Sequence, residues 1–206
     1  MMNKDKEATY AEKIYTVNGV TQENICTHGE KILHIGPGKR ALLGAKTIDI
    51  LNLSGVDIVH DLDIVPWPFK DNEFDLIFAH SVFEHLDKQI AVMEEMWRIL
   101  KPKGRIVITV PHFRCTDAFT DSTHRHFFTT QSMDYYIKTK ALSNYQYTTK
   151  NFLEKGFWFG WPQQSKNPFT RLFKWFIKRY PRFYDSHLSL LFPVKIIIWE
   201  LEAVKE

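Results

Sequence analysis

Five apolar runs of strand length lie between Lys31 and Pro111, each ending at a polar residue, a glycine or a proline. The runs are KILHI, AKTIDI, VDIVHDL, FDLIFAH and GRIVITV. Nearly continuous apolar runs separated by connecting segments are typical of a parallel sheet whose strands are buried on both faces. Ligands of such sheets bind beyond the carboxyl ends of the strands. The residues at those ends, which are the first candidates for a functional site, are Gly36, Asp49, Asp61, His80 and His112.

The segment between the fourth and fifth runs has the pattern of a helix. Apolar residues recur at steps of three and four from Ile90 to Leu100, and Asp87 is placed to act as the N-cap. Lys101 and Pro102 end the pattern. Because a helix between two parallel strands makes a right-handed crossover, we expect a doubly wound α/β unit here.

The turn after the first run is compatible with two kinds of ligand. From Gly36 the letters GPGKRA fit the G-x-G-x-x-A form of the dinucleotide fingerprint. A dinucleotide site also needs a helix that begins at the pyrophosphate and an acid about 20 residues further on. Gly44 leaves room for only about one helical turn, and Asp49 arrives too early for that acid. The spacing therefore favours a nucleoside without phosphates, with its ribose on Asp49 and its adenine amine near Asp61.

Residues 31–112 as a whole resemble the core of class I S-adenosylmethionine-dependent methyltransferases. The resemblance is carried by ILHIGPG, TIDI, DLDIVPWPFKDNEFD, FEHL and LKPKG, which occur in that order. It implies S-adenosyl-L-methionine as the cofactor and a Rossmann-like, doubly wound fold with three α/β/α layers. It also implies a seven-stranded sheet whose last strand, about residues 194–204, is antiparallel and inserted beside the fifth.

The resemblance also assigns roles to individual residues. Gly36 and Gly38 approach the methionine part of the cofactor, and Asp49 binds the ribose. The adenine lies beside Asp61 and Leu62, and His80 lies near the sulfonium. The chain departs from the family at His34, where an acid or asparagine is common, at Arg40, where a third small residue is common, and at Lys103, where glycine is common.

The acceptor side of the predicted site follows Pro111, where a polar and aromatic stretch without clear period begins. Its letters DSTHRHFF resemble a D-P-T-H-x-x-x-F stretch found after the fifth strand in some of these methyltransferases. A histidine titrating near neutrality can take a proton from an acceptor hydroxyl or amine, which makes His112 or His124 the candidate catalytic base. A structural hydrogen bond is the alternative for both.

No metal site is predicted. Glu84 and His85 resemble the end of the E-x-x-E-H cluster that holds a divalent metal in quinone O-methyltransferases. Ser81 stands where the first glutamate of that cluster would be. A helix-start or hydrogen-bonding role is the plain interpretation of this pair.

Residues 168–184 form a basic and aromatic segment, PFTRLFKWFIKRYPRFY. Its apolar residues at helical spacing are Phe169, Leu172, Phe173, Phe176 and Tyr180, opposite Arg171, Lys174 and Lys178. A helix packed on the domain with a solvated basic face is one interpretation. Contact with a membrane surface or a lipid-linked substrate is the other, because basic and aromatic residues together suit an anionic interface.

The remaining features bound the function class. A net charge of +3 gives no reason to expect nucleic acid as a partner, and Cys26 and Cys115 match no metal or redox spacing. No apolar stretch approaches the roughly eighteen residues of a membrane span, so we expect a cytoplasmic protein. We expect one domain over residues 1–206, with its core at about 28–112, a substrate-side part at 113–193 and the last strand at 194–204. Oligomeric state cannot be inferred from these features.

The predicted activity is methyl transfer to a small-molecule or glycan-like acceptor, with a hydroxyl as the accepting group. Two other classes stay open at this point. A nicotinamide-dependent oxidoreductase would share the glycine turn, and a non-catalytic cofactor-binding or scaffold protein would share the fold.

Overall fold

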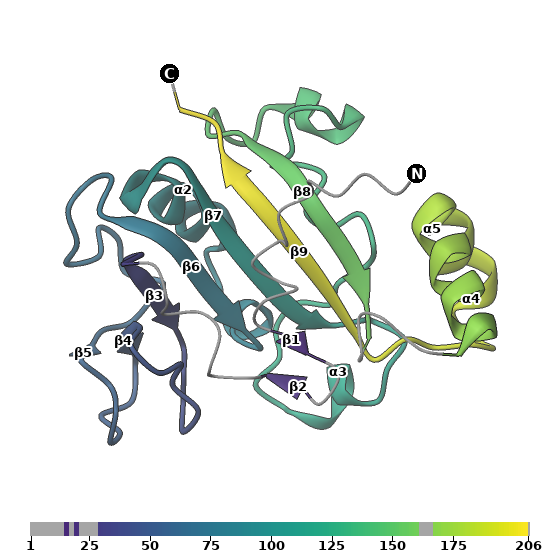
Figure 1. Ribbon diagram of the computed structural model, residues 1–206, viewed down its shortest axis with the longest axis horizontal. Coiled ribbons are helices and arrows are strands. Elements are labelled where there is room, and N and C mark those ends of the chain that lie inside the picture. Colours follow the sequence, from purple (N-terminus) through teal and green to yellow (C-terminus); the bar gives the residue numbers. More distant parts are fainter. Residues whose placement is uncertain (1–14, 17–18, 21–28, 161–166, 206) are drawn as a thin grey trace.

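The protein is described by a computed structural model, in which residues 15–16, 19–20, 29–160 and 167–205 are placed (Figure 1). Cys26 lies outside the described residues. Seven strands form one sheet in the order β5-β4-β3-β6-β7-β9-β8. The strands are β3 (Ile32–Ile35), β4 (Lys46–Asp49), β5 (Ile58–Val59), β6 (Phe74–His80), β7 (Leu100–Pro111), β8 (Phe152–Phe159) and β9 (Ile196–Ala203). A separate two-stranded antiparallel sheet joins β1 (Tyr15–Thr16) and β2 (Gly19–Val20).

The sheet has the predicted class and topology. Strands β5, β4, β3, β6 and β7 pair in parallel, whereas β9 pairs antiparallel with both β7 and β8. The last strand is thus inserted beside the fifth predicted run, as expected. The third run is extended only at Ile58–Val59, so it contributes a much shorter strand than predicted. Strands from residues 32–111 and from 152–203 share this one sheet.

Loops replace helices in three of the connections. Residues 36–73 are all described, and they contain turns but no helix between β3 and β4, between β4 and β5, or between β5 and β6. The missing phosphate-binding helix after the glycines is therefore confirmed. The other elements are η2 (Phe83–His85), α2 (Gln89–Ile99), α3 (Asp117–Thr120), η3 (Ala141–Tyr145), α4 (Pro168–Arg179), α5 (Pro181–Phe183) and the π-helical η4 (Tyr184–Leu188).

Helix α2 occupies the predicted place but begins differently. Asp87 is not its N-cap; that position is held by Lys88, whose side chain makes no capping hydrogen bond. Asp63, from the loop after β5, accepts from the backbone N–H groups of Asp87 and Lys88 at 3.0 and 2.8 Å. The carboxylate of Asp87 instead pairs with Arg125 at 2.5 Å. The start of α2 is therefore stabilised by tertiary contacts that local sequence cannot reveal.

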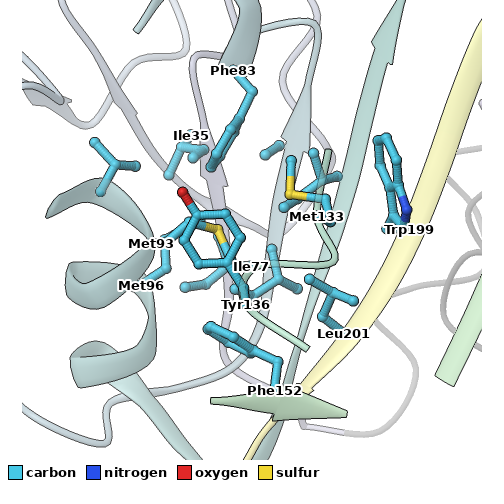
Figure 2. Close-up of a cluster of buried hydrophobic side chains, with 14 of the residues drawn as sticks. Ile35, Ile77, Phe83, Met93, Met96, Met133, Tyr136, Phe152, Trp199 and Leu201 are labelled. Atoms are coloured by element: carbon cyan, nitrogen blue, oxygen red, sulfur yellow. The ribbon is translucent and has the colours of Figure 1, made fainter. Parts of the chain in front are cut away.

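The larger apolar core lies between α2 and the sheet. Figure 2 shows Met93 and Met96 of α2 among side chains from the strands and from the connection between β7 and β8. The labelled partners are Ile35, Ile77, Phe83, Met133, Tyr136, Phe152, Trp199 and Leu201. Ile177 of α4 and Tyr184 of η4 belong to the same cluster and are fully buried. A smaller cluster on the alternate strand positions includes Phe78, Val107 and Leu42 from the glycine loop.

None of the helices in the described part of the chain has the length and apolar character needed to cross a membrane.

Candidate functional site

The glycine turn follows β3 directly and has a backbone shape that favours glycine. Gly36 has φ +59° and Gly38 has φ +52°, in the left-handed region. A Cβ added to Gly36 would lie 2.8 Å from Cβ of Val82 and closer still to its Cγ2. The N–H of Gly36 donates to the carbonyl of Ile48 at 2.9 Å, which fixes the turn against β4. The turn therefore presents backbone, not side chains, to whatever binds beside it.

Asp49 ends β4 and holds this turn in place. The residue is 6 % exposed, and its carboxylate accepts from the N–H of Gly38 through Oδ2 and from the N–H of Leu51 through Oδ1, both at 2.9 Å. Each carboxylate oxygen has a second lone pair. The group is thus fixed in orientation and still able to accept from two vicinal ribose hydroxyls.

A cavity of about 430 Å³ opens beside these residues and unites most of the predicted cofactor residues. Those that line it are Gly36, Gly38, Asp49, Asp61 and Leu62. Asp61 lies two residues beyond β5, with Oδ1 accepting from the N–H of Asp63 at 2.9 Å. Leu62 is buried, and its carbonyl accepts from the indole N–H of Trp67 at 3.0 Å.

Several residues of the cavity wall were missed from the sequence. They are Ile50, Leu51, Asp63, Ser81, Val82, His85, Leu86, Asp87 and Arg125. Ser81 and Val82 directly follow the fourth apolar run, so the strand-end rule could have found them. Arg125 comes from the acceptor-side loop and reaches this cavity through its ion pair with Asp87, for which no local sequence signal exists.

The prediction for His80 is corrected by the geometry. His80 lines a different cavity of about 420 Å³, together with His34, Arg40 and Phe78. Successive side chains of a strand point to opposite faces. Ala79 belongs to the larger core, so His80 lies on the other face with Phe78, against which its ring stacks at 5.9 Å. Ser81, one residue later, lines the first cavity instead.

His34 is buried and hydrogen-bonds to the backbone of the loop that follows the glycines. It is 3 % exposed, and its Nδ1 accepts from the N–H of Leu42 at 3.1 Å. Burial, with a smaller contribution from the charge of His80, lowers the pKa of His34 to about 3. The departure from the family at this position therefore places a neutral imidazole, not an acid, under the loop.

This burial predicts a pH dependence of folding. Unfolded His34 takes up a proton below its usual pKa of 6.5, whereas the folded residue stays neutral down to about 3. Stability should therefore fall as the pH is lowered from 6.5, at up to about 1.4 kcal/mol per pH unit from this group. Urea unfolding of wild type and His34→Asn, whose amide oxygen can still accept from Leu42, measures the difference. Parallel stability curves between pH 6 and 4 would contradict the assignment.

A second cavity, of about 730 Å³, adjoins the first and shares Ser81 and His85 with it. Its other lining residues are Glu84, Pro111, Asp117, Thr120, Asp121, Ser122, His124 and Ile196. The loop that carries His124 is fixed to η2, because the N–H groups of Arg125 and His126 donate to the carbonyl of Glu84 at 2.8 and 3.2 Å. The structure thus brings His124 to the cavity wall as predicted, beside the ring of His85 at 4.7 Å between centroids.

His112 does not reach either cavity. It is fully buried; its Nδ1 accepts from the N–H of Arg114 at 3.3 Å, and its Nε2 contacts Oδ1 of Asp185 at 3.0 Å. With one ring nitrogen accepting, the other carries the proton and donates to the carboxylate. Both nitrogens are therefore used, and the geometry gives His112 a structural role instead of that of a base.

Comparisons with known proteins find similarity to methyltransferases in part of the sequence. Residues 21–108 match the family model described as a methyltransferase domain. A glycine/sarcosine/dimethylglycine N-methyltransferase of Actinopolyspora halophila is 43% identical over 44 residues, 21% of this chain and 8% of that protein. An uncharacterized protein of Methanocaldococcus jannaschii is 42% identical over 48 residues, 23% of this chain and 21% of its own. The chain thus spans at most about a fifth of the length of these relatives.

Solved structures are similar over most of the chain. A SAM-dependent methyltransferase from Archaeoglobus fulgidus has a TM-score of 0.56 and 15% identity, covering 84% of this chain and 86% of that one. An S-adenosylmethionine-dependent methyltransferase from Mesorhizobium loti has a TM-score of 0.51 and 12% identity, covering 84% and 90%. The [4+2]-cyclase SpnF has a TM-score of 0.51 and 14% identity, covering 86% and 75%.

The fold is that of the class I S-adenosylmethionine-dependent methyltransferases, with its strand order and inserted antiparallel strand. Residues 21–108 are similar to a methyltransferase domain, and solved structures of the same fold are S-adenosylmethionine-dependent methyltransferases, which points to S-adenosyl-L-methionine as the cofactor. The resemblance seen in the sequence is thereby confirmed. The cyclase shows that this fold also occurs with another named activity, so the reaction has to be argued from the site.

Proposed function

We propose that this protein transfers the methyl group of S-adenosyl-L-methionine to a hydroxyl of a small-molecule or glycan-like acceptor. The observation that carries the proposal is the pair of adjoining cavities. One is bordered by the glycine turn and Asp49, the other by polar side chains, and Ser81 and His85 lie between them. A cofactor in the first cavity would present its sulfonium towards an acceptor in the second.

In this reaction the main task of the protein is to align the acceptor, the methyl group and the sulfur. The acceptor oxygen attacks the methyl carbon in line with the sulfur, the C–S electron pair stays on sulfur, and S-adenosylhomocysteine leaves as a neutral thioether. Holding oxygen, carbon and sulfur in that line supplies most of the rate enhancement. The acceptor proton goes to His124, which is the base that we propose for the protein without a bound metal.

A hydroxyl-bearing acceptor is supported by the lining of the second cavity. Most of its side chains can donate or accept hydrogen bonds, among them Ser81, Thr120, Asp121 and Ser122. Such a lining suits a ligand rich in hydroxyl groups, as a sugar is. The cytoplasmic location stays a prediction.

A comparison of S-adenosylhomocysteine binding with NADH binding distinguishes the proposed methyltransferase from a nicotinamide-dependent oxidoreductase. The glycine turn leads into a loop and not into a helix, so a pyrophosphate would find no helix N-terminus there. Isothermal titration calorimetry should show binding of S-adenosylhomocysteine and none of NADH at the same concentrations. The reverse preference would overturn the proposed cofactor.

Turnover separates the enzyme from a scaffold that only binds the cofactor. Wild type should release S-adenosylhomocysteine with at least one member of a panel of sugars, nucleotide sugars and small phenols or alcohols, and mass spectrometry should show a methylated oxygen. Methylation confined to amines in a parallel panel would contradict a hydroxyl acceptor. Cofactor binding without turnover on either panel would favour the scaffold.

A further inference from the structure

Three metal-ligating side chains meet at the wall of the second cavity. Glu84, His85 and His124 each offer one ligand atom, and these three atoms lie within 4.8 Å of one another. Glu84 and His85 come from η2, whereas His124 comes from the loop after α3. No metal site was predicted from the sequence because Ser81 stands where the first glutamate of the E-x-x-E-H motif would be. The third ligand is instead supplied from a distant loop.

The buried carboxylate of Glu84 has one oxygen without a hydrogen-bond partner among the described residues. That oxygen is Oε2, and Glu84 is 1 % exposed. An unsatisfied buried carboxylate oxygen is costly, and a coordinated cation is one of the few groups that offsets this cost.

The two imidazoles are held in the tautomer that coordinates a metal through Nε2. Nδ1 of His124 donates to the carbonyl of Ala118 at 2.9 Å. The hydroxyl of Thr123 donates its one proton to Asp121 at 2.7 Å, so Nδ1 of His85, 2.9 Å from that hydroxyl, must be the donor to it. Histidine ligands of metals almost always donate their other ring N–H in this way.

We propose that Glu84, His85 and His124 bind one divalent transition-metal ion. Two imidazoles and one carboxylate are the donor set of open zinc sites and of other first-row metals, whereas Mg²⁺ and Ca²⁺ prefer oxygen ligands. Small side-chain movements bring the three atoms to the roughly 2 Å metal–ligand distances of such sites. The remaining coordination positions would face the cavity.

The role of such an ion rests on the proposed function, although its binding does not. A hydroxyl of the acceptor would occupy an open position, and coordination would lower the pKa of that hydroxyl. The lone pair of His124 would then be used by the metal, so the proton would pass to solvent instead of to His124. The metal-bound protein thus needs no free imidazole as a base.

Zinc titration of the full chain tests the site without an acceptor. After treatment with a chelator and its removal, calorimetry should show one Zn²⁺ ion bound per chain and far weaker binding of Mg²⁺. His124→Ala and Glu84→Gln should each weaken Zn²⁺ binding at least about tenfold. His126→Ala is the matched control, since His126 lies in the same loop outside the cluster and should leave binding unchanged.

Three results would overturn the metal site: no Zn²⁺ binding, wild-type affinity in His124→Ala, or an equal loss in His126→Ala. Circular dichroism checks that each variant is folded. S-adenosylhomocysteine affinity, measured on the same samples, should stay unchanged in all of them. Loss of cofactor binding in wild type would refute the proposed function and leave the metal result to stand by itself.

A different observation concerns the segment α4–η4 and the residues after it. The predicted apolar face of α4 is only partly correct: Phe173 is half-buried, but Phe169 and Leu172 are 80 % and 62 % exposed. The fully buried residue of α4 is Ile177, which was not predicted to lie on that face. Figure 1 shows α4 and α5 beside β8, at the end of the sheet. The exposed large apolar side chains of this surface, called the 169–192 surface below, are Phe169, Leu172, Trp175, Tyr180, Phe183, Leu190, Leu191 and Phe192.

The charges on the 169–192 surface have one sign. Arg171, Lys178, Arg179 and Arg182 are exposed, and residues 155–184 contain no acid. Asp185 is the one acid between residues 155 and 199, and its carboxylate is 11 % exposed and occupied by His112 and Thr130. A surface that exposes aromatic and aliphatic side chains among cations complements an anionic lipid bilayer.

We also infer that the 169–192 surface binds the face of an anionic membrane. The aromatic and leucine side chains would enter the boundary between headgroups and acyl chains, and the cations would lie at the phosphates. This inference is independent of the metal and of the acceptor.

Flotation with lipid vesicles tests the membrane surface. The full chain should float with vesicles containing phosphatidylglycerol, float far less with phosphatidylcholine alone, and be released by high salt. The double variant Trp175→Ser/Leu191→Ser should reduce flotation at least about tenfold, whereas Tyr145→Ser, an exposed aromatic elsewhere, should not. Absence of flotation, equal flotation with neutral vesicles, or self-association through this surface in its place would overturn the inference.

Discussion

Asp49→Ala should lower the affinity for S-adenosylhomocysteine at least about 100-fold. The variant would lack the two hydrogen bonds that the Asp49 carboxylate makes to the ribose hydroxyls. Hydrogen bonds to a charged group contribute about 1.5–3 kcal/mol each. The substitution would also remove the acceptor of the Gly38 N–H, which lies 2.9 Å from Oδ2 of Asp49. The N–H groups of Gly38 and Leu51 would lose these part-buried hydrogen bonds at about 0.5–1.5 kcal/mol each, so the fold should persist. Isothermal titration calorimetry measures the affinity, and circular dichroism the fold.

Asp57→Ala is the matched control for this effect. Asp57 accepts from the N–H and hydroxyl of Thr47 at 2.8 and 3.0 Å, so it also anchors β4 through a carboxylate, but it does not line the cavity. Its removal should cost some stability and leave S-adenosylhomocysteine affinity near that of wild type. Undiminished affinity in Asp49→Ala, or an equal loss in Asp57→Ala, would show that the ribose lies elsewhere.

The sequence could predict which residues meet at the first cavity because that edge of the sheet is built from strand ends. Gly36, Asp49 and Asp61 follow adjacent parallel strands, and strand order together with spacing places such residues at one edge of a sheet. His80 is the exception, because it also lies at a strand end but lines a different cavity. A strand-end residue points to one face or the other, and a shift of one position decides which.

The acceptor side was less predictable because its residues meet through loops. His112 and His124 were equivalent candidates in the sequence, yet one is buried against Asp185 and the other lines a cavity. The approach of His124 to Glu84 depends on backbone hydrogen bonds from Arg125 and His126 to the carbonyl of Glu84, which no periodicity encodes. The packed side of α4 was likewise set by Ile177, whose partners lie in other elements.

Asp185→Ala should destabilise the protein by about 3 kcal/mol. Asp185 accepts from Nε2 of His112 at 3.0 Å and from the N–H and hydroxyl of Thr130 at 3.0 and 2.6 Å. His112 is fully buried, and Thr130 is 4 % exposed. Removal of the carboxylate would leave three donors without their acceptor where water has little access, at about 1–3 kcal/mol for each buried group. The midpoint of urea unfolding, with an unchanged slope, measures the loss.

Two control variants and a comparison with Asp49→Ala test this prediction. Ser186→Ala, at an exposed neighbour, should change stability by less than about 0.5 kcal/mol, and Asp185→Asn, which keeps one acceptor oxygen, should fall between it and Asp185→Ala. Because Asp185 does not line the first cavity, folded Asp185→Ala should keep near wild-type affinity for S-adenosylhomocysteine, the opposite pattern to Asp49→Ala. A loss of less than about 0.5 kcal/mol in Asp185→Ala would mean that His112 does not depend on this carboxylate, and its exclusion as a base would have to be reconsidered.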